Sequence, residues 1–325
     1  MHMQNGFGWP GLDRRTVVCV LLLFVCGSLW GAIPMLSKVA GGLDAHPVGL
    51  SLLVNSMGAV ACMLLCLQQG KLRWPTRGEM VFFFNWAILF AVFNQVLVYW
   101  LSARIDAAVV SAFTVLEGLI IFAAAGCIGL EKPSLLRCSG LLIGLSGAFL
   151  LVVSPGFFGS VGQPLMSPLF MCAGLLVPLS YAAESIYMAA RRPPDVDPLY
   201  AVLGVMVFSV PMLFALAWAT DDFMPVQFPP GRTELAAVGI MCATLIANLL
   251  YFRLIALAGS VFSGQISYFN ALFGIGWGVV VLGESWPLSM MAAFGLMLLG
   301  LLLVKPQTIN STIQVLTKPQ PWPAE

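Results

Sequence analysis

The hydrophobic positions of this chain form long runs instead of the short alternations that mark soluble helices and strands. A helix that crosses a hydrocarbon core about 30 Å thick needs about 20 mostly apolar residues. Ten segments meet this requirement: 17–39, 48–68, 80–102, 106–129, 135–153, 167–189, 199–219, 234–256, 260–282 and 288–304. The pattern therefore predicts an all-α membrane protein with ten transmembrane helices.

Turn formers and charged residues separate these runs. The clearest separators are GGLDAHP at 41–47, QQGKLRWPTRGE at 68–79, SPGFFGSVGQP at 154–164, RRPPDVDP at 191–198 and TDDFMPVQFPPGR at 220–232. Such clusters of Gly, Pro, Asp and Ser are typical of loops. The separators after 256 and 282 are very short, which predicts tight antiparallel helix pairs at these two places.

The two halves of the chain resemble each other. Segment 129–152 aligns with 282–304, and segment 29–47 aligns with 180–198. The alignment matches polar, glycine and proline positions as well as leucines: Glu131 with Glu284, Gly147 with Gly300, Trp30 with Tyr181, Asp44 with Asp195 and Pro47 with Pro198. Each half holds five predicted spans, an odd number, so the second copy must be inserted upside down. We therefore expect two inverted five-helix repeats around a central cavity.

The repeats define the expected domain organisation and orientation. It comprises an N-terminal segment 1–16, a first repeat 17–153, a linker 154–166, a second repeat 167–305 and a disordered tail 306–325. Basic residues gather in alternate loops, and short basic loops stay in the cytoplasm. The basic set is Arg14, Arg15, Lys71, Arg73, Arg77, Lys132, Arg137, Arg191, Arg192, Lys305 and Lys318, against Lys38, Arg104 and Arg232 in the other loops. We expect a bacterial-type inner-membrane protein with both termini in the cytoplasm.

Composition narrows the classes of function. The chain is 60% hydrophobic and 9% charged, and its 15 basic and 14 acidic residues nearly cancel, which argues against a nucleic-acid partner. Its eight cysteines lie mostly in apolar runs without a CxxC motif, and its two histidines are far apart. We expect no disulfide framework, metal site or cofactor. The expected partners are a small-molecule substrate and the lipid bilayer, and homo-oligomerisation stays open.

Short motifs point to a known family. Trp30 and Gly31 precede Lys38 in the first span, and VLEGLIIFAAAGCIGLE at 115–131 places Glu117 before a small, apolar run that ends in an acid. The second half has LGES at 282–285. Over residues 17–305 the chain resembles the drug/metabolite transporter superfamily, in its ten-helix branch of EamA-type domains. It departs from the pattern in lacking the proline that usually follows the first glutamate, where Gly118 stands here.

The resemblance implies a basket-like bundle and transport without ATP hydrolysis. It also implies a central cavity lined by spans 1, 3, 4, 6, 8 and 9. Export is the common direction in the family. What the motifs leave open is the substrate.

Carboxylates inside the membrane are the first candidates for function. An ionised side chain at bilayer depth costs at least about 2.5–3.5 kcal/mol, so Glu117, in the middle of the span 106–129, is predicted to couple protons or to bind a cation. The alternative is a neutral acid that is hydrogen-bonded to a neighbouring helix. Glu184 is the second candidate, although it lies closer to the end of its span.

Amide and aromatic side chains at depth complete the predicted site. The predicted substrate-binding residues are Glu117, Glu184, Trp30, Asn94, Tyr99, Tyr181, Asn248, Tyr268, Asn270 and Trp277. Each amide alone would also fit a role in helix association. Other tryptophans lie nearer to span ends and are predicted to form the interfacial belt: Trp9, Trp74, Trp86, Trp100 and Trp286.

These features predict a secondary-active exporter of a small amphipathic metabolite, amino-acid-like or cationic, that works by alternating access. Carboxylates beside aromatic rings suggest an alternative, an importer of choline or another quaternary ammonium compound. A non-transporting membrane receptor or an intramembrane enzyme are alternatives of other classes. The enzyme is disfavoured because the sequence has no Walker, HExxH or GxSxG motif.

Overall fold

The computed structural model describes residues 14–41, 46–127, 135–153, 168–193, 196–263, 266–286 and 288–303, and every regular element in these ranges is helical. The first half forms α1 (Arg14–Gly41), α2 (Pro47–Gln68), α3 (Arg77–Ala87), the π-helix η1 (Ile88–Gln95), α4 (Val96–Ser102), α5 (Ala107–Phe113), α6 (Val115–Cys127) and α7 (Leu135–Val153). The second half forms α8 (Pro168–Arg191), α9 (Pro198–Thr220), α10 (Arg232–Ser263), α11 (Ile266–Leu282) and α12 (Leu288–Leu303). The predicted linker 154–166, the tail 306–325 and most of the N-terminal segment 1–16 lie outside the described residues.

Several helices are long and apolar enough to cross a bilayer. Among the described residues five segments have this length and composition: Val17–Gly41, Pro47–Gln68, Arg77–Ser102, Pro198–Thr220 and Arg232–Leu257. Shorter apolar helices accompany them. The protein is therefore a multi-pass membrane protein. One predicted boundary is wrong, because α10 does not end near 256 but continues to Ser263.

Local sequence explains where two of the long helices begin. Thr76 accepts a hydrogen bond from the amide of Glu79, while the Glu79 carboxylate accepts one from the amide of Thr76. This reciprocal capping satisfies amides that an α-helix leaves unpaired at its start. At α9, Asp197 accepts from the amides of Leu199 and Tyr200, and Pro198 occupies the first turn, where its missing N–H costs nothing.

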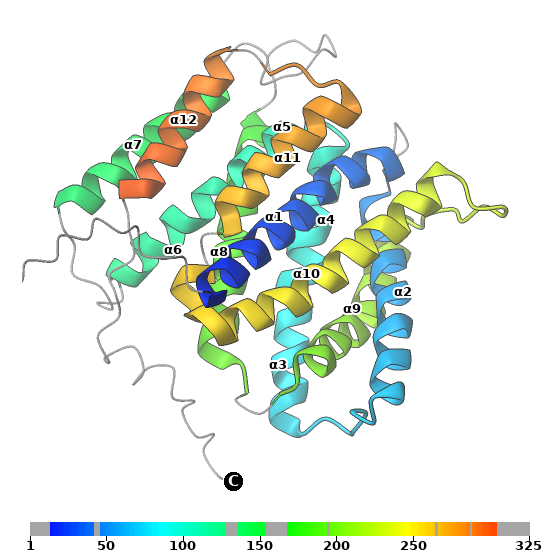
Figure 1. Ribbon diagram of the computed structural model, residues 1–325. Helices are drawn as coiled ribbons and strands as arrows, with labels where there is room; N and C mark the ends of the chain where they lie inside the picture. The colour runs from blue at the N-terminus through cyan, green and yellow to red at the C-terminus, as the bar shows by residue number, and fades with distance from the viewer. Residues whose placement is uncertain are drawn as a thin grey trace, which may run out of the picture.

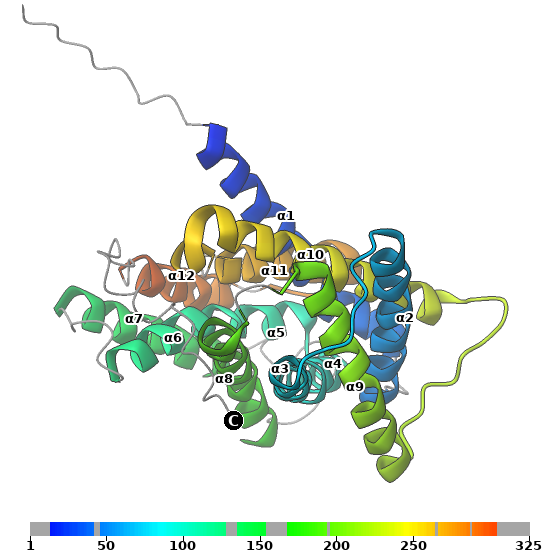
Figure 2. The ribbon, with the colours of Figure 1, turned by 90° about the horizontal axis from the view of Figure 1, so that it is seen from below.

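The helices form two layers, and the first helix of each half packs in the layer formed by helices of the other half. In Figure 1, α1 lies between α10 and α11, and Figure 2 shows these three helices on one side of the bundle, with α3, α4, α6 and α8 on the other. The contacts agree, since α1 packs on α10 and α11, while α8 packs on η1, α4 and α6. Each half therefore places its first helix against the third and fourth spans of the other half.

Corresponding helices of the two halves pack side by side and run antiparallel. A Cβ on Gly147 of α7 would lie 2.8 Å from the carbonyl oxygen of Ala293, and one on Gly300 of α12 would lie 2.6 Å from that of Gly140. The beginning of α7 thus meets the end of α12, and its later part meets the beginning. Glycine permits this close approach because a larger residue would clash with the opposing backbone.

The pair α2 and α9 follows the same rule. His46, before α2, contacts Asp222, after α9, at 2.8 Å, whereas Lys71, after α2, contacts Asp197, before α9, at 2.9 Å. In the pair α5 and α11, Ala108 lies against Gly278 and Ser111 against Gly274. Three corresponding pairs are therefore antiparallel.

Candidate functional site

Two carboxyl groups, one from each half of the chain, lie close together deep in the bundle. Glu117 projects from the first turn of α6, and Glu184 lies on α8, which packs on α6. Glu117 is hydrogen-bonded to Ser185, the residue that directly follows Glu184 in α8, so the two carboxyl groups lie close to each other. Both side chains keep part of their surface uncovered although protein surrounds them, as expected of groups that line an internal space.

Glu184 is held by two donors from the third span. The indole N–H of Trp86 donates to Glu184 Oε1 at 2.9 Å, and the side-chain amide of Asn94 donates to Oε2. The assignment of Trp86 to the interfacial belt is therefore wrong, because this side chain is 1% exposed and bonds to the site. Its distance from Asn94, eight residues or about two helical turns, was the signal in the sequence that could have placed it there.

Glu117 follows a break in the fourth span. The segment 106–129 was predicted as one helix, but α5 ends at Phe113 and α6 begins at Val115. Around Thr114 the amide of Thr114 bonds to the carbonyl of Ser111, and the amide of Glu117 bonds to that of Thr114, which is the tighter spacing of a 3₁₀ turn. The Glu117 carboxyl group accepts a hydrogen bond of 2.8 Å from the hydroxyl of Ser185 on α8.

Aromatic side chains surround the carboxyl pair. Tyr181 and Tyr251 each interact electrostatically with both Glu117 and Glu184. The Trp30 ring meets the Tyr251 ring edge to face, with centroids 5.2 Å apart. Tyr99, which is 2% exposed, interacts with Tyr181. Of the predicted residues, Asn94 bonds to Glu184 and Tyr181 interacts with both carboxyl groups, whereas Trp30 and Tyr99 reach the pair only through Tyr251 and Tyr181.

No basic side chain neutralises this pair within the described part of the chain. Glu117 accepts a hydrogen bond from Ser185, and Glu184 accepts hydrogen bonds from Trp86 and Asn94. None of these partners is Lys, Arg or His. The site therefore presents two acidic groups and aromatic surfaces, a combination that suits a cation with an apolar body.

The other predicted residues are not brought to the pair by any contact in the described regions. The Asn248 amide donates to the carbonyl of Thr244 on its own helix, at 2.8 Å. The Trp277 indole donates to the carbonyl of Ser28 on α1, at 3.2 Å. The backbone of Asn270 lies against Gly31 of α1, and Tyr268 packs against the hydrophobic core. These four residues contribute to helix packing in this structure.

A polar network on α2 adjoins the site through η1. The Gln95 side-chain oxygen accepts hydrogen bonds from Ser51 at 2.8 Å and from Asn55 at 2.5 Å. All three side chains are buried. Because Asn94 bonds to α8 and Gln95 bonds to α2, two consecutive residues of η1 tie the third span to both neighbours.

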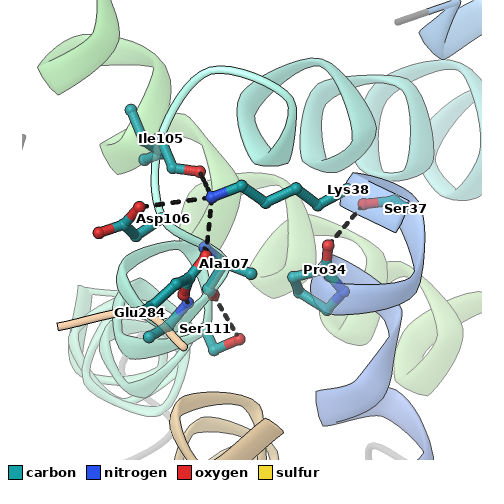
Figure 3. Close-up of polar contacts among 9 residues, drawn as sticks. Pro34, Ser37, Lys38, Ile105, Asp106, Ala107, Ser111 and Glu284 are labelled. Carbon is teal, nitrogen blue, oxygen red and sulfur yellow. Dashed lines mark hydrogen bonds and ion pairs between the residues drawn. The ribbon is translucent and has the colours of Figure 1, made fainter. Parts of the chain in front are cut away.

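A second acidic cluster lies at one end of the bundle and contains a lysine (Figure 3). Lys38, near the end of α1, bonds to Glu284 at 2.7 Å, to Asp106 at 3.3 Å and to the carbonyl of Ile105 at 3.3 Å. Glu284 also accepts from the amides of Ala107 and Ala108, at 2.8 and 2.9 Å, at the start of α5. We call Lys38, Asp106 and Glu284 the end cluster. It joins both halves of the chain.

Burial and the neighbouring charges shift the pKa of Asp106, which lies between α4 and α5. Burial raises the pKa of its carboxyl group, the nearby Glu284 carboxylate raises it further, and Lys38 lowers it, with a net increase. At the opposite end, the pKa of Asp197 is lowered, because the bonds from Lys71 and from the amides of Leu199 and Tyr200 outweigh its burial. The pKa of Asp106 is thus raised and that of Asp197 is lowered.

A cavity of about 310 Å³ lies at the Lys38 end of the bundle, away from the carboxyl pair. It is bounded by the end of α1, by His46 before α2, by Leu50 on α2, and by residues of the segment 224–234. The carboxylate in its wall, Glu234, already accepts hydrogen bonds from the amides of Gln227 and Gly231. None of the predicted substrate-binding residues lines this cavity.

Comparison with known proteins decides the family. A profile of the EamA-like transporter family matches residues 17–153 and 168–305. The chain belongs to the EamA-like transporter family. It contains two EamA repeats, and the family resemblance seen in the sequence is confirmed. EamA proteins are membrane transporters of small molecules, not enzymes.

Solved structures support the fold of this EamA protein. Twenty-five chains match, and one of them, described as "Crystal structure of protein", is 19% identical with a TM-score of 0.58. The match covers 88% of this chain and 95% of that chain. At this identity the similarity shows the fold alone. A search of curated proteins gives no match.

Proposed function

We propose that this EamA protein is a secondary-active exporter of a small amphipathic metabolite with a positively charged amine, either cationic or amino-acid-like. The proposal is carried by one observation. Glu117 and Glu184 meet deep in the bundle, one from each repeat, and no basic side chain in the described ranges neutralises them. A carboxylate that has lost its water favours a cationic partner. The substrate supplies the missing positive charge.

The aromatic side chains account for the apolar part of the substrate. A cation near the face of a tyrosine or tryptophan ring gains about 0.5–2 kcal/mol, more when water is excluded. Trp30, Tyr181 and Tyr251 lie beside the carboxyl pair. An amine with an apolar group would place its charge between the carboxyl groups and its apolar body against these rings.

Alternating access follows from the arrangement of the repeats. We propose ten crossings that form two inverted five-helix repeats, related by a pseudo-twofold axis in the membrane plane. The exchanged first helices and the three antiparallel pairs support this arrangement. The end cluster joins α1, α5 and the α11–α12 connection, so we propose that it closes the Lys38 end while the other end exchanges substrate.

The distribution of basic residues supports a cytoplasmic position for the opposite end. Lys71 and Arg73 lie there beside Asp197 and Tyr200. Basic loops are retained in the cytoplasm, so both termini would be cytoplasmic in a bacterial-type inner membrane. Closure at the outer end would leave the site to load from the cytoplasm, which is the direction expected of an exporter.

A matched set of phenyl compounds tests the proposal. Phenethylamine is a cation, phenylalanine a zwitterion, phenylacetate an anion and 2-phenylethanol neutral, while the ring is constant. We expect phenethylamine to stabilise the purified protein and to be transported in proteoliposomes, phenylacetate to do neither, and Glu117→Gln to reduce transport about 100-fold, as loss of a desolvated charge partner predicts. Equal transport of phenylacetate and phenethylamine would contradict the proposal.

A second candidate function is import of a quaternary ammonium compound. It is favoured by the edge-to-face pair of Trp30 and Tyr251 beside the carboxyl groups, since aromatic walls bind such cations. Adding choline as a competitor in the same assays distinguishes this function from export of amines. Competition by choline stronger than that by phenethylamine, with net uptake into cells, would favour this second function.

A further inference from the structure

The hydrogen-bond donors to Glu117 and Glu184 differ in chemical type, and this difference favours different roles for the two carboxyl groups. Glu184 is bonded by the indole N–H of Trp86 and by the amide NH₂ of Asn94. Glu117 is bonded by the hydroxyl of Ser185. An indole can only donate a hydrogen bond, whereas a hydroxyl can donate or accept by rotating. The two carboxyl groups therefore have different hydrogen-bonding environments.

Partners that donate N–H groups favour the charged form of a carboxyl group. Both Glu184 oxygens accept from N–H groups, and one of these belongs to an indole, which has no acceptor for a carboxylic acid proton. Hydrogen bonds to the charged form favour that form. At Glu117 the Ser185 hydroxyl can donate to a carboxylate and can accept from a protonated acid. Glu117 can therefore gain and lose a proton without losing its partner.

The π-helix η1 provides the position of one donor. It extends from Ile88 to Gln95, and a π-turn within a long helix is often found at a functional site. Gln95 is anchored to Ser51 and Asn55 on α2, so the adjacent Asn94 is fixed relative to α8. The side-chain oxygen of Asn94 has no hydrogen-bond partner in the described regions, so the bond from the side-chain nitrogen to Glu184 orients the amide.

We propose that Glu184, held by Trp86 and by Asn94 of η1, is the permanent anion that anchors the substrate cation, and that Glu117 is the group that exchanges the coupling proton. This division rests on the proposed function. The proton moves from Glu117 to water as the amine arrives and returns as it leaves, so no co-reactant is needed. Trp86 and Asn94 act through Glu184 and are positioning residues.

Other titratable groups face this pair, and their protonation states must stay constant in a test. They are Tyr181 of α8, Tyr251 of α10 and, through Tyr181, Tyr99 of α4. Phenols titrate near pH 10 in water. Measurements between pH 5.5 and 8.5 therefore leave the protonation of these three phenols unchanged.

The test compares Trp86→Phe, which keeps a ring and removes the N–H, with Ser185→Ala in proteoliposomes. We expect Trp86→Phe to raise the KM for phenethylamine about tenfold at pH 7 and to move the pH midpoint of KM upward by about one unit, since one unit corresponds to tenfold. Asn94→Leu should behave in the same way. Ser185→Ala should leave the midpoint unchanged. Trp100→Phe, a tryptophan that stacks on Phe170 away from the pair, is the matched control.

The outcomes separate the inference from the proposed function. If Glu184→Gln abolishes phenethylamine binding but Trp86→Phe leaves the pH profile of KM unchanged, the positioning role is wrong and the cation site remains. If Glu117→Gln keeps proton coupling, the division of roles is overturned. If both glutamine variants bind and transport phenethylamine normally, the proposed function fails as well. Thermal unfolding of each variant shows whether it is folded.

Discussion

Two acidic clusters in this transporter differ by the presence of a lysine. In the end cluster, Glu284 and Asp106 share Lys38, and two backbone amides complete the coordination of Glu284. At the centre, Glu117 and Glu184 meet without any basic partner among the described residues. A buried carboxylate without a cation is costly. The end cluster therefore contains its own cation, whereas at the centre we propose that the substrate supplies it.

The largest effect is expected when the centre receives its own cation. In Ser185→Lys the new ammonium would lie beside Glu117 and Glu184 and take the place of the substrate charge. We expect the affinity for phenethylamine to fall more than about 100-fold, as competition with a fixed charge implies. Ser185→Met, similar in length and uncharged, is the control. Unchanged binding in the lysine variant would show that the carboxyl pair does not hold the substrate.

A smaller effect is expected when the end cluster loses its cation. Lys38→Met leaves two neighbouring carboxyl groups without their lysine, and removing one partner of a fully buried pair costs about 3–5 kcal/mol. The Lys38 side chain is 30% exposed, so we expect a loss of about 2–3 kcal/mol in the free energy of unfolding. Reversible unfolding in mixed micelles measures it, and Lys38→Arg should recover most of the loss. No change in Lys38→Met would mean that the cluster does not stabilise the closed end.

The two perturbed aspartates should give pH dependences of opposite sign. The folded-state pKa of Asp106 is raised by burial and by Glu284, so the folded protein binds more protons than the unfolded chain between the ordinary and the raised pKa. Stability should therefore fall as pH rises through that window. Asp106→Asn should remove this component of the pH profile.

For Asp197 the folded-state pKa is lowered, despite burial, by Lys71 and by two backbone amides. Its contribution is present above the ordinary carboxyl pKa and is lost as pH falls through the lowered value. Unfolding profiles of Asp106→Asn and Asp197→Asn between pH 3 and 7 measure both. If both substitutions changed the pH dependence of the free energy of unfolding in the same direction, the opposite pKa shifts of Asp106 and Asp197 would be contradicted.

The smallest effect is expected at the exposed ion pair on the opposite end. Lys71 and Asp197 are 38% and 36% exposed, and such pairs contribute about 0–1 kcal/mol. Lys71→Met should therefore change the free energy of unfolding by less than 1 kcal/mol, against the larger loss in Lys38→Met. A loss at Lys71 equal to that at Lys38 would remove the distinction between a buried cluster and an exposed pair.

The sequence predicted the apolar spans and the two repeats, because these features depend on residue type and on spacing along one helix; the roles of Glu117 and Glu184 stay predictions. It did not predict the pairing of Lys38 with Glu284 or the contact of Trp86 with Glu184. Both join residues far apart in the chain, and they depend on how helices cross. Hydrophobic periodicity carries no information on such crossings.

Local backbone geometry was the other part that the sequence did not reveal. The segment 80–102 has the composition of an ordinary apolar helix, yet Ile88–Gln95 forms a π-helix, and the next span breaks at Thr114. The π-helix coincides with hydrogen bonds of Gln95 to α2, whereas the break coincides with local hydrogen bonds between Thr114 and Ser111. Both departures lie beside the carboxyl pair.

The most direct test of the account is transport of phenethylamine driven by a proton gradient. Proteoliposomes with the native protein and with Glu117→Gln would be given an imposed pH difference and equal phenethylamine on both sides. The account predicts more movement of phenethylamine toward the acidic side with the native protein than the neutral amine shows in protein-free liposomes, and no such excess with Glu117→Gln. An excess of equal size with both proteins would contradict the assignment of proton coupling to Glu117.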